Sequence, residues 1–365
     1  MATIKRAYGK QPDKLYFMGS SQGGREGLTM AQRYPRDFDG IFSRVPVINW
    51  VGLQHAGWKS GLAIMGEGYV TAVQVKLVHD AVLASCDGID GVADGIVSNP
   101  AACKKAFEIT KLACAPGQSG ETCLSAAQLK AVQTLHARFT FPTALANGLD
   151  DYPGWGISGE ATPGFLSAGG WSSWWLGTTP PAQPPAPTNG IAWRFGSGGV
   201  RHIFLRDPTA NVTAYDPGKH MTRIQEVSAL MDSTNPDLSS FAERGGKLIM
   251  LEHMADYAQS PYAGIRYFEA VRNRMGAERV RRFMRLFTAP GVDHVGSGAP
   301  ANVDMLSVIV DWVERGKAPG DLQVIEQTLE ATPKTLRSRP LCPWPTWPKY
   351  TGGDVDEAKS FACVK

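Results

Sequence analysis

Apolar runs and amphipathic segments alternate near both ends of the chain. The apolar runs predict buried strands at residues 15–18, 40–45, 247–251 and 283–287. The amphipathic segments predict helices at residues 25–34, 261–274 and 303–315. Strands and helices that alternate in this way are typical of an α/β fold, in which helices cover a largely parallel sheet.

The middle of the chain departs from this alternation. One amphipathic helix is predicted at 71–85, just before Cys86. The stretch 150–200 is rich in Gly, Pro, Ser and Trp, which predicts an irregular, aromatic-lined layer, because tryptophan is unusual in disordered segments. We therefore expect a core at 1–47, a large insertion at 48–225, and a return to the core at 226–365.

The composition narrows the class of protein. With 365 residues, of which 43% are hydrophobic and 19% charged, the chain can bury a sizeable core. The net charge is +3 with mixed signs and no basic cluster, so no nucleic-acid partner is expected. An apolar run of about 20 residues, which a membrane-spanning helix needs, does not occur, so no membrane partner is expected either.

A Gly-x-Ser-x-Gly pattern joins the first predicted strand to the first predicted helix. It places Gly19, Ser21 and Gly23 in the connecting turn, which is the arrangement of a nucleophile elbow. The serine of an elbow has a strained backbone that lifts its hydroxyl clear of the sheet, and side chains two residues before or after it are expected to collide. The helix that follows favours developing negative charge at its N-terminus. An ordinary glycine-rich turn is the alternative interpretation.

An activated serine needs a base, and the base needs an acid that orients it. In α/β-hydrolases these residues follow in the order Ser, Asp, His. Asp256 and His294 each lie just past a predicted strand, where such residues are expected. Glu252 and Asp293 are competing acids, and His253 is a competing histidine. Chain order and loop position favour Asp256 and His294.

Six cysteines form three sequence-local pairs, separated by 17, 9 and 21 residues: Cys86 and Cys103, Cys114 and Cys123, Cys342 and Cys363. None belongs to a C-x-x-C motif, which argues against zinc. An even number of cysteines in local pairs indicates disulfides and an oxidising compartment. The polar residues 1–14 carry no signal-peptide pattern, which conflicts with that compartment.

An acidic loop follows Cys86. Asp87, Asp90 and Asp94 alternate with three glycines, and three carboxylates so close together repel one another unless a cation lies among them. The backbone carbonyls of Val92 and Ile96 are candidates to complete an oxygen shell. The spacing differs from that of an EF-hand. A calcium site is the favoured interpretation, and a solvated acidic turn is the alternative.

Together these motifs resemble those of the tannase/feruloyl esterase family of α/β-hydrolases, which includes mono(2-hydroxyethyl) terephthalate hydrolases. The resemblance extends over nearly the whole chain. It rests on the Gly-Ser-Ser-Gln-Gly-Gly-Arg segment, the Arg-Tyr-Pro-Arg-Asp-Phe-Asp-Gly-Ile segment, the acidic loop, two short motifs with the Asp and the His, and the tail, at residues 19–25, 33–41, 86–95, 255–256, 293–294, 340–343 and 360–363.

The resemblance implies an α/β-hydrolase core with a large inserted lid domain that selects an aromatic acyl group. It implies Ser21 as nucleophile with Asp256 and His294 as its partners. It also implies a structural Ca2+ ion bound by the carboxylates and carbonyls of the acidic loop. The cysteine pairs match the family's lid and tail disulfides, so we expect Cys86–Cys103, Cys114–Cys123 and Cys342–Cys363.

Two features depart from the family pattern. Ser20 and Val295 stand where the family usually has two cysteines, joined as a disulfide beneath the triad. The nucleophile lies at residue 21, whereas in this fold it follows roughly the fifth strand. We therefore expect the first part of the core to be absent, together with any signal peptide. The open edge of strand 15–18 would then need a second copy of the chain or a separate N-terminal segment as partner.

The function expected from the sequence is that of a serine esterase acting on small esters of aromatic or phenolic acids, such as galloyl or feruloyl esters. The backbone N–H of Gln22 is a candidate oxyanion donor. Trp171, Trp174 and Trp175 are candidates to stack on the acyl group, although core packing is the commoner role for any one of them. The disulfides predict a secreted or periplasmic protein. The alternative is a catalytically impaired binding remnant, stabilised by calcium and disulfides.

Overall fold

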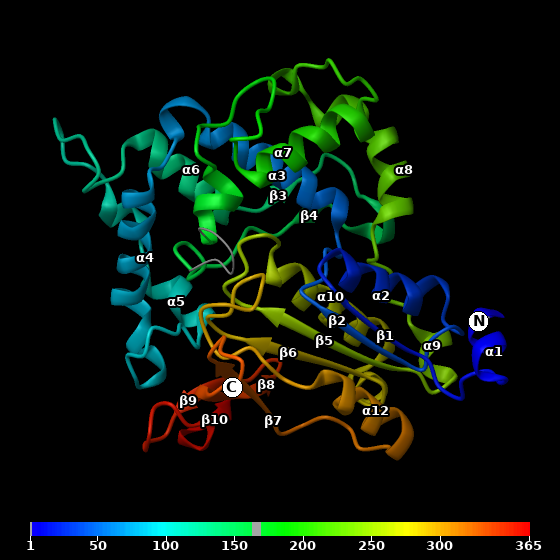
Figure 1. The fold of residues 1–365 in the computed structure, drawn as a ribbon. Coiled ribbons are helices and arrows are strands. Elements are labelled where there is room, and N and C mark those ends of the chain that lie inside the picture. Colours follow the sequence, from blue (N-terminus) through cyan, green and yellow to red (C-terminus); the bar gives the residue numbers. More distant parts are fainter. Residues whose placement is uncertain (1, 163–168) are drawn as a thin grey trace.

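The computed structural model describes residues 2–162 and 169–365. A six-stranded sheet lies at its centre, with the strand order β1-β2-β5-β6-β8-β7 (Figure 1). The first four strands in this order are parallel, β8 is antiparallel to β6, and β7 is antiparallel to β8. The strands are β1 (Tyr16–Ser20), β2 (Gly40–Arg44), β5 (Lys247–His253), β6 (Met284–Ala289), β7 (Leu322–Gln327) and β8 (Thr335–Pro343).

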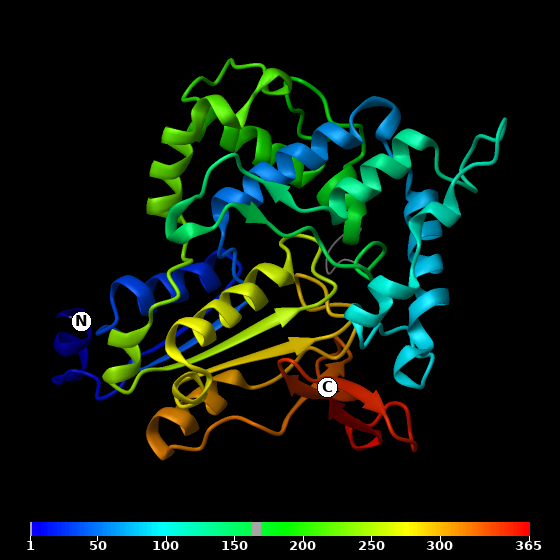
Figure 2. The same cartoon turned by 180° about the vertical axis from the view of Figure 1, so that it is seen from behind.

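Helices cover both faces of this sheet, as Figures 1 and 2 show. They are α2 (Gln22–Arg33), α9 (Ser239–Glu243), α10 (Pro261–Met275), α11 (Ala277–Arg281) and α12 (Met305–Arg315). Helix α1 (Ala2–Tyr8) lies to one side of the sheet, and its residues 3–8 are exposed (Figure 1). The four strands and three helices predicted near the ends of the chain are thereby confirmed, each with its boundaries shifted by a few residues. The α/β class is confirmed with them.

Neighbouring residues of each central strand face opposite sides of the sheet, because side chains alternate along a strand. Leu248 and Met250 belong to a hydrophobic cluster that includes residues of α2 and α10. Ile249 and Leu251 belong to a second cluster that includes residues of α12. All four side chains are buried, so both faces of the sheet are shielded from water. Continuous apolar strands of this kind suit a parallel sheet that is covered on both sides.

A mainly helical layer, hereafter the overlying layer, is formed by the described residues between β2 and α9. In both views it lies above the sheet (Figures 1 and 2). Its two short strands pair with each other and not with the central sheet. Its main elements are α3 (Trp50–Ile64), α4 (Ala72–Cys86), α5 (Pro100–Ala106), α6 (Ala126–His136), β3 (Phe139–Thr140), β4 (Asp151–Tyr152), α7 (Ile191–Gly198) and α8 (Met221–Met231).

The prediction of an irregular layer at 150–200 needs a correction. A π-helical turn, Ser172–Leu176, and helix α7 lie in this stretch. Gly196 allows α7 to pack closely on α3. A Cβ atom at Gly196 would lie 2.4 Å from the backbone N of Trp58, and one at Gly61 would lie 2.4 Å from the ring of Trp193.

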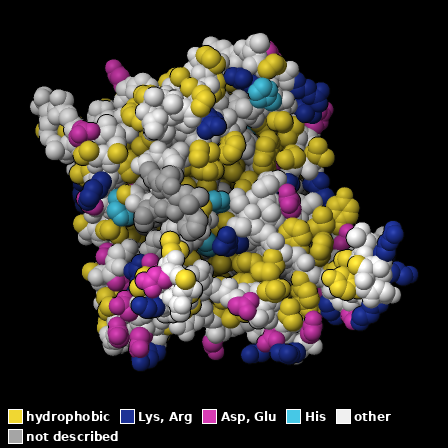
Figure 3. All heavy atoms as spheres, viewed as in Figure 1, with side chains coloured by type: hydrophobic (Ala, Val, Ile, Leu, Met, Phe, Trp, Pro, Cys, Tyr) yellow, Lys and Arg dark blue, Asp and Glu magenta, His cyan; other side chains and the backbone are white. Residues whose placement is uncertain are grey.

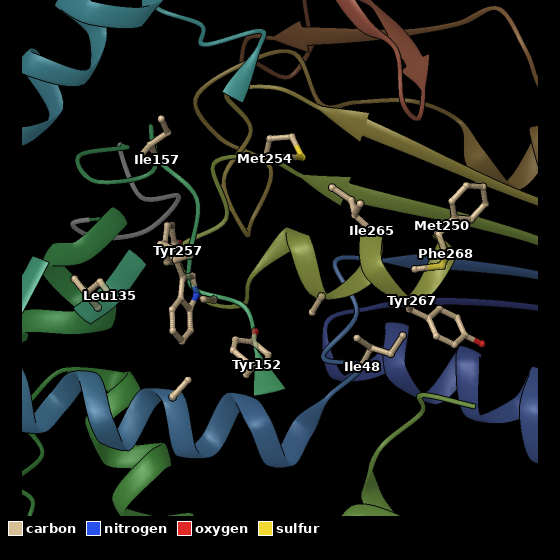
Figure 4. Close-up of a cluster of buried hydrophobic side chains, with 14 of the residues drawn as sticks. Ile48, Leu135, Tyr152, Ile157, Met250, Met254, Tyr257, Ile265, Tyr267 and Phe268 are labelled. Carbon is tan, nitrogen blue, oxygen red and sulfur yellow. The ribbon is translucent and has the colours of Figure 1, made fainter. Parts of the chain in front are cut away.

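The overlying layer shares a hydrophobic core with the sheet. Figure 4 shows Leu135 and Tyr152 of this layer in one cluster with Met254 and Tyr257, which follow β5. Tyr152 is only 1% exposed, and its hydroxyl oxygen accepts a hydrogen bond from the backbone N–H of Ser260. The layer is therefore fixed to the loops that follow β5.

The three expected disulfides are present, with Cα–Cα distances of 5.0 Å for Cys86–Cys103, 4.8 Å for Cys114–Cys123 and 5.6 Å for Cys342–Cys363. The last one joins β8 to the C-terminal hairpin of β9 (Trp347–Tyr350) and β10 (Phe361–Val364). In the described parts of the chain, no helix is both long enough and apolar enough to cross a membrane.

Strand β1 lies at the edge of the sheet. Within residues 2–162 and 169–365 it pairs only with β2, and its Met18 is 45% exposed. An exposed apolar edge of this kind is what the sequence predicts for residues 15–18. The partner expected for this edge, a second copy or a separate segment, stays a prediction.

Asp232 ties together the two connections between the sheet and the overlying layer. Its carboxylate accepts hydrogen bonds from the backbone N–H of Val51, at 3.0 Å, and from the hydroxyl of Ser228, at 2.5 Å. Next to it, the N–H of Ser233 donates to the carbonyl of Ile48, at 2.9 Å. Asp232 is 2% exposed, and burial raises its pKa to about 6.

This raised pKa predicts a pH-dependent stability. The folded protein binds the Asp232 proton more tightly than the unfolded chain, whose reference pKa is 3.8, so the stabilising effect is complete at low pH. It is lost as the pH rises from that value through about 6. Asp232→Asn, which cannot ionise, should therefore gain stability relative to the wild type over this range. Urea denaturation at several pH values measures the difference.

The exposed Asp80 on α4 provides the control, because Asp80→Asn makes the same change of side chain at a surface position. A free-energy difference between wild type and Asp232→Asn that stays constant across this pH range would contradict a raised Asp232 pKa.

Candidate active site

Ser21 occupies a sharp turn between β1 and α2. Its φ is 82° and its ψ is −109°, a conformation that costs most non-glycine residues free energy. A Cβ atom at Gly19 would lie 2.2 Å from the carbonyl oxygen of Gly23, and one at Gly24 would lie 2.6 Å from the carbonyl oxygen of Arg44. The expected crowding is thus confirmed at Gly19. It is wrong at Gly23, where a Cβ meets no atom within 4 Å.

The structure brings the three predicted residues together. His294 Nε2 lies 3.0 Å from Ser21 Oγ, and His294 Nδ1 lies 2.7 Å from Asp256 Oδ2. The three residues follow β1, β5 and β6. Because parallel strands end at the same edge of a sheet, residues just past their carboxyl ends meet there. The order and loop positions read from the sequence therefore correspond to one site.

The competing residues have other contacts. Glu252 is fully buried and accepts a hydrogen bond from the side-chain amide of Gln259, at 3.0 Å. Asp293 Oδ1 accepts three backbone N–H bonds from its own loop, the shortest of them, 2.8 Å, from Ser297. His253 Nδ1 lies 2.6 Å from the Asp293 carbonyl, and burial lowers the His253 pKa to about 4. These contacts organise the loops around the site.

The electrostatics of the site favour a positively charged His294. Burial lowers its pKa, but the nearby Asp256 carboxylate and its hydrogen bond outweigh burial, so the pKa is raised above the ordinary histidine value. Asp256 Oδ1 also accepts hydrogen bonds from the backbone N–H groups of Ala258, at 2.7 Å, and Gln259, at 3.0 Å. The carboxylate is 2% exposed, so these donors replace the water that it gives up.

A cavity of about 600 Å3 opens beside Ser21 and His294. Trp174 lines it, with its ring centre 6.2 Å from that of His294. Hydrophobic side chains also gather on the surface along the junction between the overlying layer and the sheet (Figure 3). Other lining residues come mainly from α3, α7 and the turn after α7; they include Trp50, Leu53, Gln54, Arg194, Phe195, His202 and Ile203.

The other two candidate tryptophans lie elsewhere. Trp171 is 3% exposed and Trp175 is 1% exposed, and both belong to the hydrophobic core. The Trp175 indole N–H donates to the carbonyl of Tyr257, at 3.1 Å. Sequence reasoning missed the cavity residues of α3 and α7, because an apolar helix that lines a pocket has the same pattern as one that fills a core.

Ser20 and Val295 replace the two cysteines of the family's disulfide. Arg44 Nε donates a hydrogen bond to Ser20 Oγ, at 3.0 Å. Val295 is 48% exposed. In this chain, therefore, a polar contact between β1 and β2 occupies the place where the sequence lacks the cysteine.

The acidic loop is only partly suited to a cation. Asp87 accepts hydrogen bonds from the backbone N–H groups of Asp94 and Gly95, at 3.1 and 3.0 Å, and Asp94 pairs with Arg339. Asp90 is 1% exposed, and its Oδ2 atom has no hydrogen-bond partner in the described residues. Burial also raises the Asp90 pKa. An orphaned buried oxygen fits a cation ligand.

Other features of the loop are less favourable to a metal ion. The Arg339 guanidinium already supplies a positive charge at Asp94. Among the residues that the structure describes, no group of three or more His, Cys, Asp or Glu side chains is arranged so that it could hold a metal ion. A calcium site therefore needs the backbone carbonyls predicted from Val92 and Ile96, and the metal stays a prediction.

The elbow, the sheet and the order of Ser21, Asp256 and His294 define an α/β-hydrolase fold. The family model for tannase and feruloyl esterase matches residues 1–364, and the chain belongs to this family. The feruloyl esterase B structure from Aspergillus oryzae superposes with a TM-score of 0.83 and 25% sequence identity, covering 100% of this chain and 71% of the other. The resemblance read from the sequence is confirmed.

Curated relatives agree with this assignment. The chain is 36% identical to an uncharacterised esterase of Agrobacterium fabrum over 99% of its length, and 32% identical to the mono(2-hydroxyethyl) terephthalate hydrolase of Piscinibacter sakaiensis over 100%. It is also 32% identical to a probable feruloyl esterase of Arthroderma benhamiae over 100%. The chain spans 66% of the length of each of these relatives.

The backbone conformation at Ser21 gives a prediction about stability alone. Ser21→Gly and Ser21→Ala both remove the hydroxyl, but only glycine adopts this φ and ψ without steric cost. Ser21→Gly should therefore be more stable than Ser21→Ala by roughly 1–3 kcal/mol in urea denaturation.

Ser85, exposed near the end of α4, is the matched control. There the order should reverse, because glycine is the poorer helix former by about 1 kcal/mol. Equal stability of the two Ser21 variants would show that the turn stores no strain.

Proposed function

We propose that the chain is a carboxylic ester hydrolase that uses Ser21, His294 and Asp256 as a catalytic triad. The main support is the line of contacts through the His294 ring. Its Nε2 lies 3.0 Å from Ser21 Oγ, and its Nδ1 lies 2.7 Å from Asp256 Oδ2. Membership of the tannase and feruloyl esterase family supports the same reaction.

In this mechanism the Ser21 oxygen attacks the ester carbonyl while His294 Nε2 takes the hydroxyl proton. His294 then gives this proton to the leaving alcohol, which departs from an acyl-Ser21 intermediate. Water attacks the acyl group with the same histidine as base, and Ser21 is restored. Asp256 holds the Nδ1–H tautomer and stabilises the imidazolium that forms in each half-reaction.

The backbone N–H of Gln22 is proposed as one oxyanion donor. Gln22 is the first residue of α2 and lines the cavity. An N–H group in the first turn of a helix has no partner within the helix, and the helix dipole adds positive potential there. Both properties favour the negative charge that develops on the carbonyl oxygen.

The proposed substrates are small esters of aromatic or phenolic acids, with a galloyl, feruloyl or similar acyl group. Aromatic rings line the cavity from three elements, through Trp50, Trp174 and Phe195, and offer faces for stacking. The overlying layer then acts as a lid domain that shapes the acyl site. The names of the relatives, feruloyl esterase and terephthalate hydrolase, refer to aromatic acids as well.

Two further features belong to this proposal. The disulfides favour an exported protein, secreted or periplasmic, because they persist in oxidising compartments.

The acidic loop is proposed to hold one structural Ca2+ ion, with Asp87, Asp90 and Asp94 as carboxylate ligands and the carbonyls of Val92 and Ile96 as the others. The support from the structure is the buried, unpartnered Asp90 oxygen.

The triad predicts a graded loss of activity. Ser21→Ala and His294→Ala should each abolish hydrolysis of a simple aromatic ester. Asp256→Asn should retain a weak activity, about 10⁴-fold below the wild type, because the asparagine favours the wrong histidine tautomer. Activity of the wild type should fall as the pH drops through the raised His294 pKa, because only neutral imidazole accepts the serine proton.

A fluorophosphonate probe gives an independent readout, since it should label the wild type at Ser21 and leave Ser21→Ala unlabelled. Ser20→Ala is the control, because Ser20 bonds to Arg44 and not to His294. Absence of both labelling and turnover in the folded wild type would favour a binding remnant. Full turnover in Ser21→Ala would remove Ser21 from the mechanism.

The calcium proposal predicts a melting temperature that rises with added Ca2+ and falls with chelator. Asp90→Asn should abolish this dependence, because it removes a charged ligand. Asp80→Asn, on the exposed face of α4, should keep it. If chelation leaves the melting temperature of the wild type unchanged, Arg339 alone balances the charge of the loop and no ion is needed.

A further inference from the structure

A second buried acid lies behind the Asp256 carboxylate. Glu252, near the end of β5, is 0% exposed, and Gln259, in the loop that follows Asp256, is 1% exposed. The Gln259 side-chain nitrogen lies 3.0 Å from Glu252 Oε2 and 3.2 Å from Asp256 Oδ2. A primary amide has two N–H groups, so it donates to both acids at once. The contacts form a chain from Glu252 through Gln259, Asp256 and His294 to Ser21.

The surroundings of Glu252 disfavour its charged form. Burial raises its pKa well above the ordinary value, and the Asp256 charge raises it further, whereas the hydrogen bond from Gln259 lowers it. Burial therefore favours the neutral form of the carboxyl group, which still accepts the Gln259 bond. Only Asp256 then needs to carry the negative charge that faces His294.

The Glu252 carboxyl packs against helix α10 at Gly264. A Cβ atom at Gly264 would lie 1.7 Å from Glu252 Oε1 and 2.7 Å from its carboxyl carbon. The absence of a side chain at Gly264 thus makes room for the acid. Glu252 is held between this helix and Gln259, so its position is set by packing as well as by the hydrogen bond.

We propose that Glu252 and Gln259 are positioning residues, which hold the Asp256 carboxylate so that Oδ2 faces His294. This inference rests on the proposed triad and extends it by two residues. The backbone N–H groups of Ala258 and Gln259 fix Oδ1 of Asp256, and the Gln259 side chain fixes Oδ2. Without the Gln259 bond the carboxylate rotates about its last torsion, and without Glu252 the Gln259 amide loses its second anchor.

The test compares four variants in the full chain: Glu252→Gln, Glu252→Leu, Gln259→Met and the double variant Glu252→Leu with Gln259→Met. Glu252→Gln keeps a carbonyl that accepts the Gln259 bond, whereas Glu252→Leu removes it at similar volume. Gln259→Met removes both donated bonds. Because Gln259 lines the cavity and Glu252 does not, the Glu252 pair separates effects on kcat from effects on KM.

We expect Glu252→Leu to lower kcat on the order of 10- to 100-fold with little change in KM, because a small misplacement of a catalytic group has effects of this size. Glu252→Gln should restore most of the lost turnover. The double variant should be no worse than Gln259→Met, because the two residues act in one chain. The acid limb of kcat/KM should move to lower pH in Glu252→Leu, since a loosely held Asp256 raises the His294 pKa less.

A spectroscopic readout distinguishes positioning from a loss of folding. The proton between His294 Nδ1 and Asp256 should give a low-field NMR signal in the wild type and in Glu252→Gln. The signal should weaken in Glu252→Leu and Gln259→Met. If Glu252→Leu does not fold, the low-field signal of Gln259→Met still tests whether these residues position Asp256.

Unchanged acid limbs and unchanged low-field signals in folded Glu252→Leu and Gln259→Met would overturn the inference. Additive effects of the two substitutions would also overturn it. Full turnover in Ser21→Ala would instead overturn the proposed triad, so the two failures are distinguishable.

Discussion

The backbone at Ser21 is held by hydrogen bonds on both of its polar groups, and the rest of the site depends on this constraint. Its N–H donates to the carbonyl of Arg44, at 3.0 Å, and its carbonyl accepts from the N–H groups of Val47 and Arg25, both at 3.1 Å. The turn is therefore joined to the end of β2 and to the first turn of α2. A strained conformation persists only where its surroundings over-determine it in this way.

The same segment begins the overlying layer. The chain leaves β2 at Arg44, passes Val47, which lines the cavity, and enters α3 at Trp50. Asp232, at the point of return, bonds to the first turn of α3. The stretch that follows β2 therefore both bonds to the turn at Ser21 and begins the wall of the cavity.

Much of the core and most of the site could be predicted from the sequence, because local patterns determine them. The elbow has its own motif, and Asp256 and His294 follow apolar strands whose ends meet in any parallel sheet. The packing of the overlying layer was harder to predict from the sequence. Gly61 and Gly196 allow α3 and α7 to approach closely, and a glycine in the sequence does not by itself indicate which helix packs against it. Which tryptophan faces the cavity depends on this packing, and so Trp174 could not be told from Trp171 and Trp175.

The positions of Glu252 and Asp293 could be read from the sequence, but not their charge states, which depend on the donors around them. Asp256 accepts from the backbone N–H of Ala258, from the backbone N–H and the side-chain amide of Gln259, and from His294. Glu252 accepts one amide bond, and burial raises its pKa well above the ordinary value. Burial also raises the pKa of Asp293, against three backbone donors. Buried carboxylates so close together cannot all ionise without cost. The donors converge on Asp256, the carboxylate that contacts the imidazole, which is where an imidazolium forming at His294 needs a partner.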